Sequence, residues 1–229
     1  MVYVQNAHVL GDNMDNNLDG VEAIFLDLDG TIYLGGDLIP GALEFLERCD
    51  EKGVKRFFLS NNSSKSVAQY VEKLSGLGIP ASEEEVLLST HDLIAWLHGF
   101  DYERVYLIGT QGMKDMLIGA GLTMDAENPE IVVLGYDTEI NYEKISIASI
   151  HLHAGVPLVA SHPDMVCPSP DGGLPDVGAY LAMLKVTTGV DPEHITGKPN
   201  AGMIMHKIEE LGLDPEKCAM VGDRLYTDI

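Results

Sequence analysis

Two carboxylates stand two residues apart at the end of a short apolar run. Residues 21–28 contain β-branched and aromatic side chains, which predicts a buried strand, and an Asp-Gly pair follows. Because alternate side chains of a strand share a face, we expect Asp27 and Asp29 to point into one pocket. Such close carboxylates repel each other unless a divalent cation and a lysine neutralise them.

Three later clusters contain groups that could neutralise or complement this pair. Ser60 follows a predicted strand over residues 54–59, Lys198 lies in a Gly-Lys-Pro turn, and Asp223 and Asp228 follow a predicted strand over residues 218–221. In an open parallel sheet, ligands bind outside the carboxyl ends of the strands, so these groups are expected to gather. Asp223 and Asp228 can complete the oxygen ligation that Mg²⁺ demands, and Lys198 adds positive charge.

The combined set predicts phosphoryl chemistry. Asp27 would attack phosphorus in line and form an acyl phosphate, while Asp29 would protonate the leaving alkoxide and later deprotonate the attacking water. Ser60, the backbone N–H groups around it and Lys198 would stabilise charge on the transferring group. Each cluster alone is weak evidence, since an Asp-Gly pair is usually only a turn. Because all four clusters lie at the ends of predicted elements, together they favour a functional site.

The elements that must position these residues alternate along the chain. Strands over 21–28 and 54–59 alternate with helices over 42–49 and 64–77, which predicts a parallel sheet with helices on its faces. A second α/β run predicts a separate unit over residues 82–186, inserted between core segments 21–81 and 187–229. Its strands are expected at 105–108, 131–134 and 157–161, and its helices at 111–120 and 142–154. A further helix is expected at 178–188. Residues 1–20, with many Asn and Asp, predict a weakly ordered extension.

Composition narrows the classes of partner. Thirty-six acidic and fourteen basic side chains give a formal charge of -22, which argues against nucleic acid and anionic lipid. No apolar run approaches the length of a membrane span. Three scattered cysteines, Cys49, Cys167 and Cys218, indicate neither a disulfide framework nor a zinc site, so we expect a cytoplasmic protein.

The four clusters resemble the motifs of the haloacid dehalogenase (HAD) superfamily, in its NagD-like, p-nitrophenylphosphatase-type branch (subfamily IIA). The matching strings are Asp-Leu-Asp-Gly-Thr-Ile-Tyr from residue 27, Ser-Asn-Asn-Ser from residue 60, Gly-Lys-Pro from residue 197, and Gly-Asp-Arg-Leu-Tyr-Thr-Asp-Ile from residue 222. The resemblance runs from about residue 21 to the last residue and implies a Rossmann-like parallel-sheet core with a large inserted α/β cap.

The resemblance also implies roles for individual residues. Mg²⁺ would be bound by the side chains of Asp27 and Asp223 and by the main-chain carbonyl of Asp29, with Asp228 in support. The residues expected to contact the phosphate are Thr31, Ser60, Asn61, Asn62 and Lys198.

The activity that the resemblance implies is Mg²⁺-dependent hydrolysis of a small phosphate monoester through an aspartyl-phosphate intermediate. Substrates in this branch include sugar phosphates, phosphoglycolate, glycerol phosphate, nucleoside monophosphates and pyridoxal phosphate, and the cap usually selects among them. Because such caps often mediate dimers, a homodimer through the cap is a further expectation.

Two departures from the resemblance stand out. Relatives often read Thr-Asn-Pro-Asp where this chain has Ser161-His162-Pro163-Asp164, although a single loop His such as His162 is more often structural than functional. Cys167 is interpreted in the same way. Relatives also continue for several dozen residues beyond the fourth motif, so the chain is expected to be a fragment whose sheet has an uncovered edge.

Alternatives from other classes remain open on sequence alone. A signalling or binding module similar to receiver domains also uses a phosphorylated Asp, a Lys and Mg²⁺, but the second carboxylate at Asp29 favours rapid hydrolysis over a lasting phosphoryl mark. The early end at Ile229 motivates a third reading, an inactive fragment. Phosphoryl transfer to an acceptor other than water is also compatible with the motifs.

Overall fold

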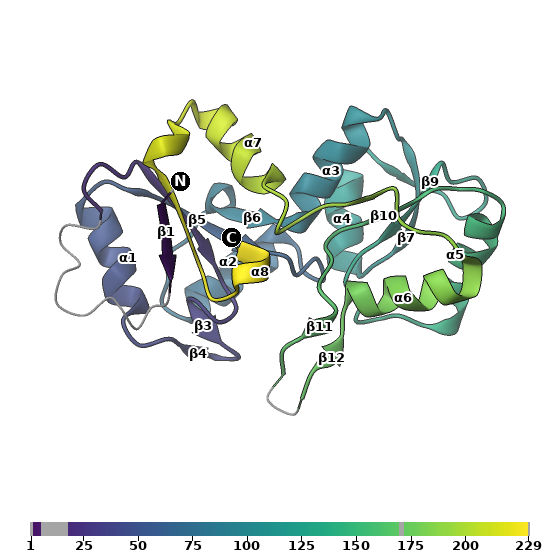
Figure 1. Cartoon of the computed structure of the whole chain (residues 1–229), viewed down its shortest axis with the longest axis horizontal. Coiled ribbons are helices and arrows are strands. Elements are labelled where there is room, and N and C mark those ends of the chain that lie inside the picture. Colours follow the sequence, from purple (N-terminus) through teal and green to yellow (C-terminus); the bar gives the residue numbers. More distant parts are fainter. Residues whose placement is uncertain (1, 6–17, 170–171, 229) are drawn as a thin grey trace. The chain divides into compact units, whose positions relative to one another are not determined.

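The structure, a computed structural model, describes residues 2–5, 18–169 and 172–228 of the chain (Figure 1). The chain folds into two compact units, each interrupted in sequence. The first comprises residues 1–60, 67–87 and 201–229, and the second comprises residues 61–66 and 88–200.

A five-stranded sheet forms the centre of the first unit. Its strand order is β1-β14-β2-β5-β6, and the pairs β1–β14, β14–β2 and β2–β5 are parallel. The bounds are β1 Val2–Gln5, β2 Ala23–Asp27, β5 Lys55–Ser60, β6 Val86–Leu88 and β14 Cys218–Gly222. Leu26 pairs with Val221 on one side and Phe58 on the other, so β14, β2 and β5 end side by side.

Burial on both faces explains why this sheet is built from apolar runs. All five residues of β2 are buried, as expected of a parallel strand covered on both faces. Phe25 and Met220 pack with Ile204 and Ile208 of helix α7 (Gly202–Leu211) on one face. Helices α1 (Ala42–Glu51) and α2 (Val67–Gly76) bury their own apolar stripes, which are Leu46 and Cys49 in α1 and Tyr70 and Leu74 in α2.

The second unit contains its own five-stranded sheet, in the order β13-β10-β9-β7-β8, with parallel pairing throughout. Its strands are β7 Arg104–Ile108, β8 Thr123–Met124, β9 Ile131–Leu134, β10 Leu158–Ala160 and β13 His194–Ile195. Helices α3 (Ser89–Gly99) and α4 (Gln111–Gly119) pack with Val133 and its neighbours on one face. Helices α5 (Tyr142–His153) and α6 (Val177–Thr188) pack with Val132 and its neighbours on the other.

Short elements complete both units. In the first unit, β3 (Tyr33–Leu34) and β4 (Asp37–Leu38) form a hairpin after β2, and α8 (Leu225–Asp228) follows β14. The segments η3 (Glu83–Glu85) and η4 (Pro215–Lys217) are single 3₁₀ turns. In the second unit, β11 (Val166–Cys167) and β12 (Leu174–Pro175) pair antiparallel within residues 163–175, for which the many Pro, Gly, Asp and Ser residues predict one long loop.

The α/β fold class expected from the sequence is confirmed, and several details differ. Within the expected N-terminal extension, β1 pairs with β14, whereas residues 6–17 lie outside the described residues. Residues 187–200, which the sequence places in the core, are part of the second compact unit. The acidic residues 83–85 suggest a helix start in the sequence, but the structure has a single 3₁₀ turn there, followed by β6 and then by helix α3.

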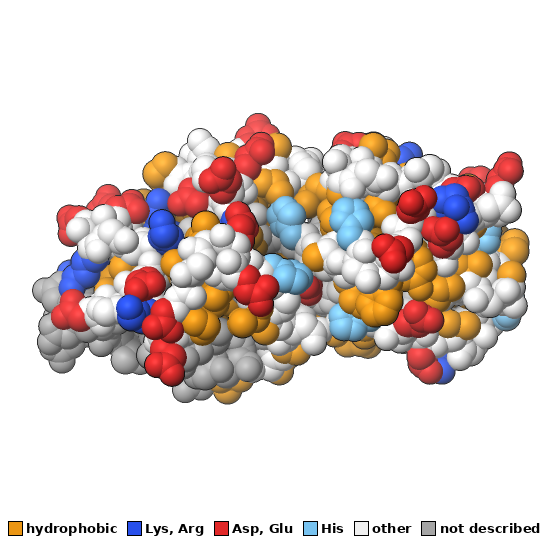
Figure 2. Space-filling view, turned by 90° about the horizontal axis from the view of Figure 1, so that it is seen from above, with side chains coloured by type: hydrophobic (Ala, Val, Ile, Leu, Met, Phe, Trp, Pro, Cys, Tyr) orange, Lys and Arg blue, Asp and Glu red, His pale blue; other side chains and the backbone are white. Residues whose placement is uncertain are grey.

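Two properties of the surface bear on partners. Acidic side chains are spread over the face shown in Figure 2, as the formal charge of -22 requires. Across residues 2–5, 18–169 and 172–228, no helix combines the length and apolar character that spanning a membrane demands.

Candidate active site

Three carboxylates gather at the carboxyl ends of β2 and β14 in the first unit. Asp27 is the last residue of β2, Asp223 directly follows β14, and Asp228 ends α8. One carboxylate oxygen from each of the three lies within 4.8 Å of the others. The parallel pairing of β2 with β14 explains this, because it brings the ends of the two strands side by side.

Two glycines allow this close approach. A Cβ atom on Gly30 would lie 2.4 Å from Oδ2 of Asp223, and Gly30 has φ of +101°, a conformation that L side chains rarely adopt. A Cβ atom on Gly222 would lie 2.3 Å from Cγ of Asp228. Gly30 therefore lets the turn after β2 approach Asp223, and Gly222 lets Asp228 lie against the end of β14.

The three carboxylates suit a hard divalent cation. Asp27 and Asp228 are buried and Asp223 is exposed, so the cluster has an open side. Side-chain oxygens are the ligands that Mg²⁺ prefers, and carboxylates this close repel one another without a cation. Asp228 is also fixed locally, because its Oδ2 accepts a hydrogen bond of 3.0 Å from the backbone N–H of Arg224.

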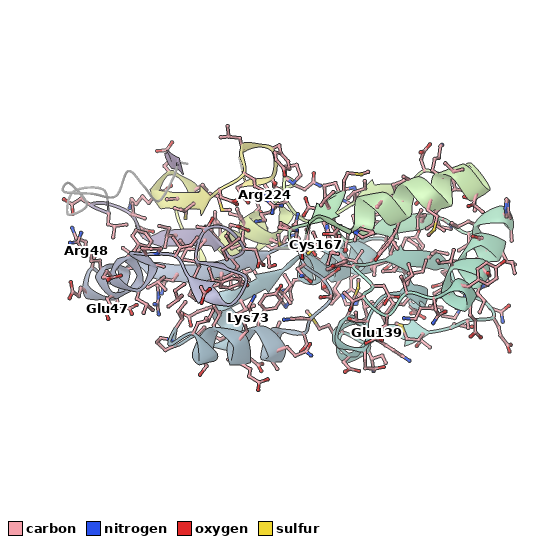
Figure 3. All side chains as sticks on the ribbon, turned by 90° about the horizontal axis from the view of Figure 1, so that it is seen from below. Glu47, Arg48, Lys73, Glu139, Cys167 and Arg224 are labelled. Carbon is pink, nitrogen blue, oxygen red and sulfur yellow. The ribbon has the colours of Figure 1, made fainter. Side chains whose placement is uncertain are left out.

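Asp29 has different surroundings from Asp27. Its Oδ2 accepts a hydrogen bond of 3.4 Å from the hydroxyl of Tyr33, and its Oδ1 lies 3.9 Å from Nζ of Lys73. Lys73 extends from α2 (Figure 3), and its Nζ lies 3.6 Å from the centre of the Tyr33 ring. Burial is the main cause that raises the pKa of Tyr33, with the charges of Tyr70, Asp29 and Asp27 adding to it, so Tyr33 remains a neutral donor.

Ser60 and Thr31 belong to the segments at the ends of β5 and β2 in the first unit. Asp27 pairs with Leu59, so Ser60 at the end of β5 comes one position beyond Asp27. The hydroxyl oxygen of Ser60 lies 3.0 Å from that of Tyr70. Thr31 is buried, and its hydroxyl has no hydrogen-bond partner among the described residues, which makes it a donor available to a ligand.

Asn61 and Lys198 are joined in the second unit. The amide of Asn61 accepts a hydrogen bond of 2.8 Å from the backbone N–H of Lys198 and donates one of 2.9 Å to its carbonyl. The same amide donates to Oδ2 of Asp164 at 3.0 Å. Asn62 bonds locally instead, since its Oδ1 accepts from the backbone N–H and the hydroxyl of Ser64.

The structure thus groups part of the expected site and adds residues that sequence reasoning missed. Asp27, Asp223 and Asp228 come together, whereas the carboxylate of Asp29 turns to Tyr33 and Lys73. Tyr33 was part of a recognised motif without an assigned role. Lys73 carries no sequence signal, because only the placement of α2 brings it to Asp29.

Comparison with known families gives an independent result. The chain matches the family model described as haloacid dehalogenase-like hydrolase over residues 24–123, and a second model described as HAD-hydrolase-like over residues 195–229. It is 38% identical to an acid sugar phosphatase of Staphylococcus aureus (strain MRSA252) over 212 residues, which cover 91% of this chain and 81% of the relative.

Solved structures of phosphatases are also similar to this chain. The crystal structure of a 4-nitrophenylphosphatase from Thermotoga maritima matches with a TM-score of 0.89 at 41% identity, covering 93% of this chain and 82% of that one. A glycerol phosphate phosphatase from Mycobacterium tuberculosis in complex with magnesium matches with a TM-score of 0.85 at 29% identity, covering 93% and 65%. Together with the motifs in the fold, these matches show that the chain belongs to the haloacid dehalogenase-like hydrolase family, as one of its phosphatases.

Proposed function

We propose that the chain hydrolyses the phosphate monoester of a small metabolite with a bound divalent cation, most simply Mg²⁺. The observation that carries this proposal is the convergence of three carboxylate oxygens, from Asp27, Asp223 and Asp228, within 4.8 Å at the ends of two parallel strands. The residues proposed to hold the cation are these three, together with the main-chain carbonyl of Asp29. The cation would withdraw charge from the phosphoryl oxygens.

The proposed reaction has two halves, each centred on Asp27. First, a carboxylate oxygen of Asp27 forms a bond to phosphorus while the ester P–O bond breaks, and Asp29 gives its proton to the leaving alkoxide. Water then attacks phosphorus, Asp29 takes a proton from that water, and the bond between Asp27 and phosphorus breaks. The products are the alcohol and inorganic phosphate, and both carboxyl groups return to their starting states.

Other residues have proposed supporting roles. Ser60, Thr31 and Asn61 would bind phosphoryl oxygens, Lys198 would supply a positive charge for them, and Asn62 would contribute through its main chain. The unbonded hydroxyl of Thr31 supports its share of this task. Tyr33 and Lys73 would hold Asp29 between the two proton transfers.

The substrate class proposed here is a sugar phosphate or glycerol phosphate. The support is the similarity to two relatives, an acid sugar phosphatase and a glycerol phosphate phosphatase. Phosphoglycolate and nucleoside monophosphates remain in the group to be tested. A screen of these four ester classes, each at equal concentration with Mg²⁺, would rank them by kcat/KM.

The first prediction concerns the nucleophile. Asp27→Asn keeps the size of the side chain but removes the attacking charge, so phosphate release from p-nitrophenyl phosphate should fall at least about 10³-fold. The matched control is Asp115→Asn, at an exposed position on α4, which should keep full activity. Equal rates for Asp27→Asn and the unaltered protein would overturn the assignment. A phosphorylated protein that survives for minutes would favour the signalling alternative.

A further inference from the structure

A buried histidine with no hydrogen-bond partner lies between two carboxylates in the second unit. His162 follows β10 and has no exposed surface, and neither of its ring nitrogens has a hydrogen-bond partner among the described residues. Its Nδ1 lies 3.5 Å from Oδ2 of Asp164, and its Nε2 lies 3.5 Å from Oδ1 of Asp176. A buried polar ring without partners needs a physical explanation.

The two carboxylates differ in how their charge is already compensated. Asp176 is the N-cap of α6, and its Oδ1 accepts a hydrogen bond of 2.7 Å from the backbone N–H of Val177. The helix N-terminus also favours its negative charge. Asp164 does not cap a helix, and its Oδ2 accepts a hydrogen bond of 3.0 Å from the amide of Asn61. A proton on Nδ1, facing Asp164, therefore stabilises the folded unit more than a proton on Nε2, facing Asp176.

A continuous series of contacts runs from this ring to the main chain of Lys198. Asp164 accepts from the Asn61 amide, and the same amide exchanges two hydrogen bonds with the N–H and carbonyl of Lys198. The preceding residue is fixed as well, because the N–H of Gly197 donates to Asp92 at 2.9 Å. The Asn61 amide thus fixes the main chain of Lys198, and its hydrogen bond to Asp164 restrains the orientation of the amide.

We propose that His162 is a positioning residue for Lys198: its Nδ1–H holds Asp164, Asp164 orients Asn61, and Asn61 fixes the main chain of Lys198. The part of this proposal that concerns catalysis rests on the proposed function, in which Lys198 binds the phosphoryl group. The contact of 3.5 Å is long for a hydrogen bond, and such bonds often tighten when substrate is bound.

The imidazole ring of His162 is neutral at ordinary pH and therefore carries one proton, on either Nδ1 or Nε2. Burial, with a smaller contribution from the charge of Lys198, lowers the pKa of His162 to about 3. In both ionisation states Nδ1 can carry the proton that Asp164 accepts, so the contact does not depend on charging the ring.

Two substitutions of His162 separate positioning from packing. His162→Leu fills most of the space but has no donor, whereas His162→Asn, the residue expected in relatives, keeps an N–H close to the position of Nδ1. In His162→Leu, kcat for p-nitrophenyl phosphate should fall about 10–100-fold with KM changed less than about threefold, as for other outer partners of an active-site group. In His162→Asn, kcat should stay within about threefold. His153→Leu, at an exposed site on α5, is the matched control and should change neither value.

A second readout does not depend on activity. Hydrogen exchange at the amide of Lys198, measured by NMR, should be at least about tenfold faster in His162→Leu than in the unaltered protein, and close to normal in His162→Asn. Amides of β10 should keep their protection in both variants. If His162→Leu fails to fold, Asp164→Ala tests the same link, because it removes the acceptor at a half-buried position.

The outcomes are distinguishable. Unchanged exchange at Lys198 in both His162→Leu and Asp164→Ala would overturn the proposal, as would a ring whose Nδ1 carries no proton by ¹⁵N NMR. Faster exchange together with a lower kcat would support it. If the unaltered protein hydrolyses no phosphate ester while the exchange still responds, the positioning role stands and the proposed function fails.

Discussion

At the scale of single residues, the two aspartates of the first motif, Asp27 and Asp29, have different surroundings. Asp27 lies among other carboxylates on a buried strand end, whereas Asp29 lies two residues later and contacts a phenol and an ammonium group. Carboxylates whose environments differ in this way can perform different tasks, one as a nucleophile and the other as a proton carrier. Lys73 and Tyr33 are therefore central to the proposed mechanism, because both contact Asp29.

Lys73 can be tested by varying the leaving group. Lys73→Met keeps a side chain of similar length but removes the ammonium group, and with it the ion pair with Asp29 and the contact with the Tyr33 ring. Proton donation matters most when the leaving group is a poor one, so kcat/KM for a sugar phosphate should fall about tenfold while that for p-nitrophenyl phosphate falls no more than about twofold. Lys52→Met, which removes an ion pair with Asp19 at the surface, is the control. Equal losses for the two substrates would contradict the role of Lys73.

The sequence predicted residues of this site unevenly. Asp27, Asp29, Asp223 and Asp228 could be singled out because each follows a strand, where ligands of parallel sheets bind. The contacts of Asp29 with Lys73, and of His162 with Asp176, could not, since they depend on how separate helices and loops pack. Sequence spacing carries no information about such contacts, and a lone His or Lys is most often a surface residue.

At the scale of elements, the strands were the most predictable part. Runs such as those of β2, β9 and β14 are apolar over four or five residues because a parallel strand is buried on both faces. Helix α3 was missed, although Leu93 and Leu97 are buried, because polar residues interrupt its apolar face. One of these, Asp92, is buried and accepts the N–H of Gly197, so tertiary contacts rather than periodicity explain it.

The turn after β2 gives a test of how two elements approach each other. In Gly30→Ala, the added methyl group would meet Oδ2 of Asp223 and would also need a φ of +101°. We expect a loss of about 1–3 kcal/mol in unfolding free energy and at least a tenfold weaker affinity for Mg²⁺, measured by denaturation and by calorimetry. Gly35→Ala, at φ of +64° with no atom within 4 Å, is a matched control that carries backbone strain alone.

The metal response separates the two glycine variants. Gly35→Ala should lose stability by about 1 kcal/mol and bind Mg²⁺ normally. If Gly30→Ala binds Mg²⁺ as tightly as Gly35→Ala does, the close approach of the two segments is not needed to assemble the carboxylates.

At the scale of the whole molecule, the net charge follows directly from the sequence. The formal charge of -22 is spread over both units, and long-range repulsion disfavours polyanionic partners. The division into two α/β units was expected, but the exact boundaries follow from packing, since residues 61–66 belong to the second unit. A homodimer through the inserted unit and a cytoplasmic location remain predictions.

The free energy of unfolding should depend on Mg²⁺, because the cation would bind the clustered carboxylates of the folded first unit. Without a cation, the carboxylates of Asp27, Asp223 and Asp228 repel one another and destabilise the folded first unit. A cation that binds only the folded state stabilises it by about 2.7 kcal/mol at a concentration 100 times its Kd. We expect Mg²⁺ to raise the melting temperature of the unaltered protein by several degrees.

Asp228→Asn should change the two parts of this response in opposite directions. The amide oxygen can still accept from the N–H of Arg224, while one charge of the cluster is lost. The metal-free variant should melt at the same or a higher temperature than the unaltered protein, and its gain on adding Mg²⁺ should be smaller by at least half. Asp115→Asn, far from the cluster in sequence, should keep both values. A metal-free variant that melts lower, with a full Mg²⁺ response, would contradict the role of Asp228 in binding the cation.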